Sequence, residues 1–145
     1  MVISNGAKTS KGITASYSNG TWTFNGTITG DSNGIINLYG GGALASITEA
    51  GTYSVYVENQ NALIGTSGQS KTCLQFYWYH NDATSDDDTR RNYHYFYNGD
   101  NNPHTFTIPE NYHMTRISFF MNGSATGTVL TNRKLKFTLK KVNNT

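Results

Sequence analysis

Residues 12–38 have the sequence GITASYSNGTWTFNGTITGDSNGIINL and decide the fold class of the chain. Ile13 and Ala15 alternate with polar residues, and Trp22 and Phe24 do so again after an intervening Asn-Gly dipeptide. Alternation with a period of two predicts a strand, and Asn-Gly favours the positive φ angles of a tight hairpin turn. The stretch therefore predicts an antiparallel hairpin. Later strands must cover its aromatic face, because two strands alone are marginally stable in water.

The composition agrees with a β protein of one domain. The chain has 145 residues, of which 36% are hydrophobic, 13% aromatic and 14% charged, and 15 are glycine. That length buries a sufficient core without a disulfide or a metal, so we predict a single domain over residues 1–145. Cys73 lies in an apolar run and is interpreted as a buried small hydrophobe rather than a nucleophile.

Charge and hydropathy exclude several classes of partner. A net charge of +2 is too small to indicate nucleic acid, and we interpret the basic residues of 133–141 as a solvated strand face. No segment reaches the roughly 18 apolar residues of a membrane span, and the first residues lack the features of a signal peptide. We expect either a chain that is not secreted by that route or one cut from a larger protein.

Short alternating or apolar runs continue to the end of the chain, separated by Gly, Asn and Asp. The predicted strands are 12–18, 21–29, 34–39, 52–58, 71–80, 91–98, 104–108, 114–122 and 134–142. A helical turn is an option for residues 43–49. This pattern predicts an all-β fold, specifically an antiparallel β-sandwich with a jelly roll as first choice. The side chains predicted to face the core include Tyr53, Val55, Val57, Ile117, Phe119 and Met121.

Two strands have more aromatic residues than one core face needs. In residues 73–80, alternation puts Leu74, Phe76 and Trp78 on one face and Gln75, Tyr77 and Tyr79 on the other. Residues 91–97 likewise separate Arg91, Tyr93, Tyr95 and Tyr97 from Asn92, His94 and Phe96. A sheet needs only one apolar face, so the second aromatic face is the strongest indication of function.

We interpret the surplus aromatic residues as a carbohydrate-binding surface. Tyrosine has a flat apolar ring for the C–H face of a sugar and a hydroxyl for its rim. An alternative stays open, in which the same side chains form cross-strand pairs or contact another subunit. The candidate ligand-binding residues are Tyr77, Trp78, Tyr79, His80, Asp82, Arg91, Tyr93 and Tyr95.

Four segments of the chain resemble a known domain. They are GAKTSKGIT at 6–14, NGTWTFNGTIT at 19–29, AGTYSV at 50–55 and TNRKLKF at 131–137. Together they resemble a β-sandwich domain, similar to a carbohydrate-binding module, found in tail and baseplate proteins of phages of Gram-positive bacteria. That domain is often an insertion or extension of a distal tail protein, and the resemblance covers nearly the whole chain. The family's usual ending is closer to KPML, whereas residues 138–141 here are TLKK.

The resemblance implies a setting and partners rather than a site, because its motifs belong to the scaffold. It implies a domain excised from a larger tail protein and located in the virion, at the tail tip or baseplate. The implied partners are a cell-wall or surface polysaccharide of the host and other phage tail proteins. The expected function is non-catalytic attachment to that polysaccharide. The alternative is a structural module that contacts neighbouring tail subunits.

Enzyme and metal chemistry have weaker support. A glycosidase needs two carboxylates about 5 to 9.5 Å apart. The acidic run 86–88 is followed by Arg90 and Arg91, which is instead the pattern of a solvated loop tip. The four histidines lack metal-ligand spacing. Calcium remains an option between Asn81 and Asp88, where oxygen ligands are dense, although the EF-hand pattern fails there. We expect no catalytic residue and no cofactor.

Overall fold

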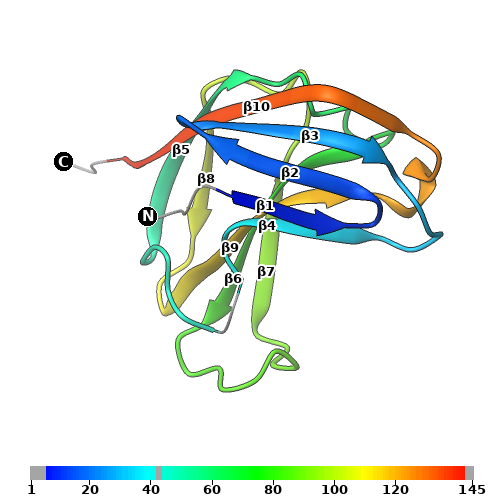
Figure 1. The fold of residues 1–145 in the computed structure, drawn as a ribbon. Helices are drawn as coiled ribbons and strands as arrows, with labels where there is room; N and C mark the ends of the chain where they lie inside the picture. The colour runs from blue at the N-terminus through cyan, green and yellow to red at the C-terminus, as the bar shows by residue number, and fades with distance from the viewer. Residues whose placement is uncertain (1–5, 42–43, 143–145) are drawn as a thin grey trace.

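The computed structural model describes residues 6–41 and 44–142, which form two antiparallel sheets packed face to face (Figure 1). The six-stranded sheet has the order β1-β2-β3-β10-β5-β8, and the four-stranded sheet has the order β4-β9-β6-β7. The strand bounds are β1 Gly6–Ser10, β2 Ile13–Ser18, β3 Thr21–Thr27, β4 Gly34–Gly40, β5 Gly51–Asn59, β6 Thr72–His80, β7 Arg91–Phe96, β8 His104–Ile108, β9 Tyr112–Met121 and β10 Val129–Lys141. A short 3₁₀ helix, η1, spans Gly123–Ala125. The predicted all-β sandwich is confirmed.

The strand pairing has the nested order of a jelly roll. From β3 onward, the first strand pairs with the last, so that β3 pairs with β10, β4 with β9, β5 with β8 and β6 with β7. A long hairpin rolled into two sheets gives this order, which corresponds to two Greek keys. The remaining strands, β1 and β2, extend the six-stranded sheet beyond β3.

The hairpin predicted around Asn19-Gly20 is present. Tyr17 pairs with Trp22 and Ser18 with Thr21, which leaves the Asn-Gly dipeptide as a two-residue turn. Its φ angles are 50° and 85°, both in the left-handed region that a type I′ turn requires.

A second hairpin precedes it and was not predicted. Lys11 and Gly12, with φ angles of 53° and 81°, turn the chain between β1 and β2. The prediction began a strand at Gly12, whereas Gly12 is a turn residue and β2 begins at Ile13. A Cβ at position 12 would lie 2.3 Å from the Thr27 carbonyl oxygen, so glycine is required there.

The core lies between the two sheets and includes the side chains predicted from alternation. Phe24 of β3 stacks on Phe119 of β9 with ring centroids 4.1 Å apart, which joins the predicted hairpin to the opposite sheet. The predicted inward sets of β5 and β9 are all buried, as are Leu74, Phe76 and Trp78 of β6. Cys73 is a free, buried cysteine, also as predicted.

Other boundaries differ from the predicted ones. Strand β10 begins at Val129 rather than at 134, because a register shift between Leu130 and Arg133 accommodates one extra residue within a continuous strand. Asn132 adopts φ of 47° at this shift, and its backbone N–H donates to Asn25 Oδ1 at 2.8 Å. Residues 44–49 contain no helical turn but an isolated bridge at Thr48; Ala43 lies outside the described residues.

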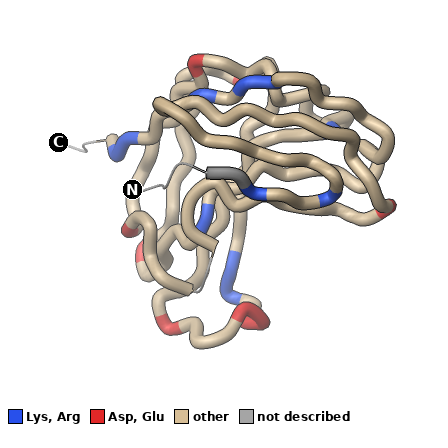
Figure 2. The backbone as a smooth tube through the Cα atoms, in the orientation of Figure 1, with Lys and Arg blue, Asp and Glu red and all other residues tan. Residues whose placement is uncertain are grey.

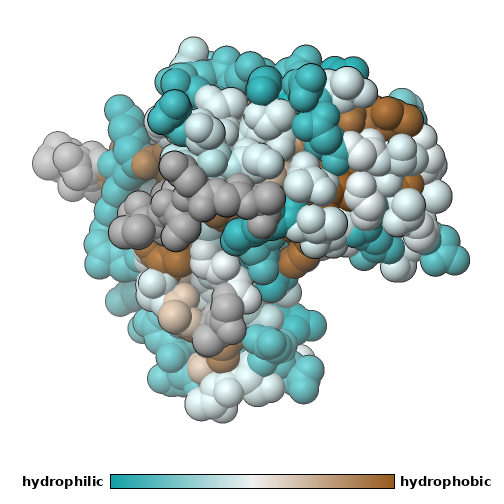
Figure 3. All heavy atoms as spheres, in the orientation of Figure 1, coloured by the Kyte–Doolittle hydropathy of each residue, from teal (hydrophilic) through white to brown (hydrophobic). Residues whose placement is uncertain are grey.

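The surface is mixed in character. On the face in view, hydrophobic residues form small separate areas among hydrophilic ones (Figure 3). The acidic tip of the β6–β7 loop lies next to the basic start of β7, at the lower end of the molecule (Figure 2). Within residues 6–41 and 44–142, no helix has the length and hydropathy needed to cross a membrane.

Candidate functional site

The outer face of the four-stranded sheet, which points away from the core, is rich in tyrosine. Cross-strand register places Tyr77 of β6 between Arg116 of β9 and Tyr93 of β7. The neighbouring rows follow the same order of strands: Ser118, Gln75 and Tyr95 in one, and His113, Tyr79 and Arg91 in the other. Because the side-chain period is two, residues two apart on β6 and β7 share the outer face. On β9, a register shift places Arg116 and His113, which are three residues apart, opposite Tyr77 and Tyr79.

The aromatic rings on this side form one connected series. Tyr77 stacks on Tyr93 with centroids 6.0 Å apart, and Tyr93 meets Tyr95 at 4.9 Å. From Tyr95 the series continues to Tyr97 at 5.7 Å and to Phe120 at 5.2 Å. We call this set, together with Tyr79, the aromatic face. Its six residues are Tyr77, Tyr79, Tyr93, Tyr95, Tyr97 and Phe120.

The exposure of these rings varies along the face. Tyr93 is 49% exposed and is among the most exposed large side chains of the described residues. Burial raises the pKa of Tyr77, Tyr95 and Tyr97 above the ordinary value of a tyrosine. Their hydroxyls are therefore neutral at physiological pH and can both donate and accept hydrogen bonds.

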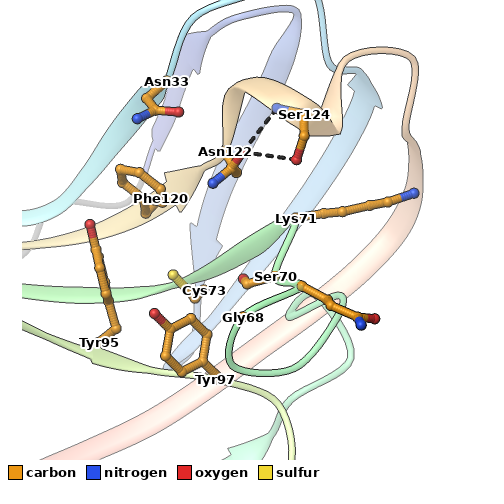
Figure 4. A pocket seen from close by; sticks show the side chains of 11 residues that line it. Asn33, Gly68, Ser70, Lys71, Cys73, Tyr95, Tyr97, Phe120, Asn122 and Ser124 are labelled. Carbon is orange, nitrogen blue, oxygen red and sulfur yellow. Dashed lines mark hydrogen bonds between the residues drawn. The ribbon is translucent and has the colours of Figure 1, made fainter.

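A pocket of about 700 Å³ lies at one end of the aromatic face (Figure 4). Tyr95, Tyr97, Cys73 and Phe120 of the three neighbouring strands line one side of it. The loop before β6, the segment around η1 and the loop before β4 supply the remaining lining residues, which are Gly68, Gln69, Ser70, Lys71, Asn122, Ser124 and Asn33. In Figure 4 the Lys71 side chain points away from the tyrosines, so amide and hydroxyl groups are the polar groups nearest the rings.

The η1 side of the pocket is held by local hydrogen bonds. Asn122 Oδ1 accepts from both the backbone N–H and the hydroxyl of Ser124, at 2.9 and 2.8 Å (Figure 4). Asn33 Oδ1 accepts from the Gly123 backbone N–H at 2.7 Å, which ties the loop before β4 to η1. These bonds fix the polar rim before any ligand arrives.

At the other end, the β6–β7 loop covers part of the aromatic face. The Tyr79 hydroxyl donates to the backbone carbonyl of Asp86 at 3.1 Å, and an Arg91 guanidinium N–H donates to the same carbonyl at 2.5 Å. Tyr79 is consequently only 3% exposed. Arg90 pairs with Asp88 at 2.8 Å and lowers the pKa of that carboxyl to about 2, which agrees with the predicted loop tip of compensating charges.

The structure brings together five of the eight predicted site residues. Tyr77, Tyr79, Tyr93, Tyr95 and Arg91 share the outer face. Trp78 does not belong to it: the indole is 6% exposed, faces the core and stacks on Phe106 at 6.1 Å. Its alternation with Tyr77 and Tyr79 is the physical reason, because neighbouring residues on a strand point to opposite faces.

His80 and Asp82 lie together, but apart from the aromatic face. His80 has the parity of Trp78 and packs edge-on against Tyr112. Its Nδ1 is 3.8 Å from a carboxylate oxygen of Asp82, whose side chain is 81% exposed in the loop. This pair lies at the base of the β6–β7 loop rather than on the aromatic face.

Sequence reasoning missed Arg116, Phe120, Tyr97 and the polar lining of the pocket. Tyr97 has the outward parity of Tyr93 and Tyr95, so a longer candidate set would have included it. Arg116 and Phe120 come from β9, and only the pairing of β9 with β6 places them beside Tyr77 and Cys73. The sequence has no signal for that register, because a shift occurs between Tyr77 and Trp78.

The described residues contain no group of three His, Cys, Asp or Glu side chains that could hold a metal ion. The whole segment proposed for calcium, Asn81 to Asp88, belongs to these described residues. Asp88 there is engaged with Arg90, and Asp82 contacts His80.

Fold and site together define an all-β sandwich with jelly-roll strand order and an aromatic outer face on its four-stranded sheet. Comparisons of the chain with models of protein families, with curated proteins and with solved structures found no match.

Proposed function

We propose that the aromatic face binds a carbohydrate chain and does not cleave it. The observation on which the proposal rests is the connected row of tyrosine rings that leads from Tyr77 through Tyr93 and Tyr95 to the end pocket. A row of rings suits a chain of sugar units, because each pyranose can lay its C–H face on one ring. The pocket beyond Tyr95 then accommodates a further unit.

The polar groups around the rings suit neutral hydroxyls. Amides and hydroxyls of Asn33, Asn122 and Ser124 line the pocket and can both donate and accept, as sugar hydroxyls do. Tyrosine also loses little conformational entropy when a ligand fixes it, since it has two side-chain torsions. Affinity for one chain is expected to be modest, because the face is open rather than enclosed.

The lining favours binding over hydrolysis. Among the residues that the structure describes, no Asp or Glu side chain lines the end pocket. Glycoside hydrolysis needs a pair of carboxylates on either side of the scissile bond. The nearby acidic side chain of Asp100 accepts the Tyr97 backbone N–H at 2.8 Å and is engaged in that turn.

The biological setting is part of the proposal and is supported by the sequence resemblance. We propose that the domain attaches a phage tail tip to a surface polysaccharide of a Gram-positive host. Several copies on one tail would compensate for a weak single site, because linked weak sites gain about 10² to 10⁴ in avidity without new contacts.

The test is binding of the fluorescently labelled domain to intact Gram-positive cells, with the double variant Tyr77→Ala, Tyr95→Ala beside the native protein. We expect binding to fall at least about tenfold, because two stacking platforms are lost. Tyr56→Ala is the matched control, since Tyr56 is 46% exposed but lies on β5 of the other sheet. A double variant that folds and binds cells like the native protein would remove the site from the aromatic face.

A structural contact with a neighbouring tail subunit is the second candidate function. The exposure of Tyr93 favours it, since exposed aromatic side chains also form protein interfaces. Where the subunit contact is between copies of this chain, size-exclusion chromatography over a range of concentrations distinguishes it from a carbohydrate site. A concentration-dependent oligomer that Tyr93→Ala abolishes would support the interface, whereas a monomer that binds cells supports the carbohydrate site.

A further inference from the structure

Arg116 lies beside Tyr77 at the β9 side of the aromatic face and has no hydrogen-bond or ion-pair partner for its side chain among the described residues. Its guanidinium carbon is 4.0 Å from the centroid of the Tyr77 ring, so the cation lies over one face of that ring. Its Nε is buried, and no described group accepts a hydrogen bond from it. No ion pair between Arg116 and a described carboxylate is present.

The other three arginines differ from Arg116 in this respect. Arg90 pairs with Asp88, Arg91 donates to the Asp86 carbonyl, and Arg133 donates to the Asn61 carbonyl at 3.2 Å. A buried donor without an acceptor is costly, so native proteins nearly always satisfy one. An arginine that is held in place by a ring, with its donors unused, is a site for an acceptor supplied from outside the chain.

The surroundings of Arg116 favour an anionic acceptor. Tyr77 lies close enough to both Arg116 and Arg91 that each guanidinium acts on the hydroxyl electrostatically. Two positive charges thus flank one ring, and neither forms an ion pair with a described carboxylate. Guanidinium groups match carboxylate and phosphate in geometry and can bind them through two parallel hydrogen bonds.

Gln75 adds a second unused polar group beside Arg116. It is 5% exposed and lies one row further along the same face. Its Oε1 is buried without a donor, whereas its Nε2 makes a long contact of 3.5 Å with the Tyr95 hydroxyl. Because this Oε1 is closed to solvent, Gln75 makes the surroundings of Arg116 polar without itself contacting a ligand.

We infer that Arg116 binds an anionic group of the glycan, a carboxylate or a phosphodiester, while neighbouring sugar rings stack on Tyr93 and Tyr95. This inference rests on the proposed carbohydrate function and specifies its ligand class. The charged group fixes the position of the chain along the row of tyrosines, and the rings supply contact area. The face therefore distinguishes acidic glycans from neutral ones of the same ring structure.

Calorimetric titration of the whole chain tests the inference with matched probes. Hyaluronan is compared with carboxyl-reduced hyaluronan, which keeps the rings and lacks the charge, and poly(glycerol phosphate) is compared with uncharged polyglycerol. We expect an anionic probe to bind about tenfold or more tightly than its neutral counterpart, and Arg116→Gln to abolish that preference. Arg133→Gln, on β10 of the other sheet, is the control for general attraction to a basic protein. Binding of hyaluronan would indicate a carboxylate ligand, and binding of poly(glycerol phosphate) would indicate a phosphate ligand.

A second measurement does not depend on the identity of the sugar. The Nε–H signals of the arginines are followed by NMR while glucuronate, glycerol phosphate or glucose is added. We expect the Arg116 signal to shift with an anion and not with glucose, while the Arg133 signal stays in place. Equal shifts at both arginines, or none at Arg116, would overturn the inference. Retained cell binding in Arg116→Gln together with loss in Tyr77→Ala, Tyr95→Ala would overturn it and leave the carbohydrate function standing.

Discussion

The two faces of β6 and β7 have similar aromatic content but opposite environments. On the inner face, Phe76 and Phe96 are completely buried. On the outer face, Tyr93 is half exposed and Tyr77 and Tyr95 are partly so. Phe76 and Phe96 have no hydroxyl, which in the core would need a partner, whereas the hydroxyls of Tyr77, Tyr93 and Tyr95 lie where water can reach them. Aromatic residues therefore stabilise the fold on one side and form a partly exposed surface on the other.

Removal of an inner ring is expected to have the largest effect on stability. Phe119→Ala deletes the ring that stacks on Phe24 at 4.1 Å, between the two sheets. We expect the free energy of unfolding to fall by about 3 to 5 kcal/mol, since the sheets cannot close fully over the cavity. Urea denaturation measures the loss. A decrease below about 1 kcal/mol would show that the core adapts, contrary to its close packing.

A pH titration of stability tests the inner side of β7. His94 has the inner parity, packs against Phe106 and has its Nε2 only 2.6 Å from that of His104. Burial, and then the proximity of His104, lowers the pKa of His94 below the ordinary value of 6.5. The unfolded chain therefore binds a proton more readily, and stability is lost as pH falls below about 6.5.

The urea midpoint at pH 7.5 and 5.5 measures this effect. We expect a lower midpoint at pH 5.5, and a smaller difference between the two pH values in His94→Gln. Asp100 acts in the opposite direction on His94, so Asp100→Asn is expected to increase the difference. An unchanged pH dependence in His94→Gln would assign the effect to other groups.

The smallest expected effect on stability comes from the outer face. Tyr93→Ala removes a ring that is 49% exposed, so the free energy of unfolding should change by less than about 1 kcal/mol. The same change is expected to weaken cell binding, because Tyr93 lies in the middle of the row of rings. A loss of stability as large as that of Phe119→Ala would mean that the outer rings belong to the core, and the distinction between the faces would fail.

Much of the fold could be predicted from local patterns. Asn19-Gly20 identified its hairpin, and alternation identified the buried sets of β5, β6 and β9. The prediction failed where the sequence pattern is weak. Strand β1 is short and polar at the edge of its sheet, and the Lys11-Gly12 turn lacks the Asn-Gly signal.

The candidate site was only partly predictable, for a reason of register. Parity within β6 and β7 places Tyr77, Tyr93 and Tyr95 together without knowledge of other strands. The position of Arg116 depends on β9, which is paired to β6 with a shift of register between Tyr77 and Trp78. No local pattern encodes such a shift, so the position of Arg116 beside Tyr77 emerged only from the structure.

The alternation of Tyr77, Trp78 and Tyr79 along one strand limits how this surface can evolve. One inserted or deleted residue in β6 would move every following side chain to the opposite face, exchanging tyrosines with the core. We therefore expect ligand preference to change through substitutions at outward positions, which leave the register intact. Changes of length belong in the loop of residues 81–90, which joins β6 to β7 and covers Tyr79.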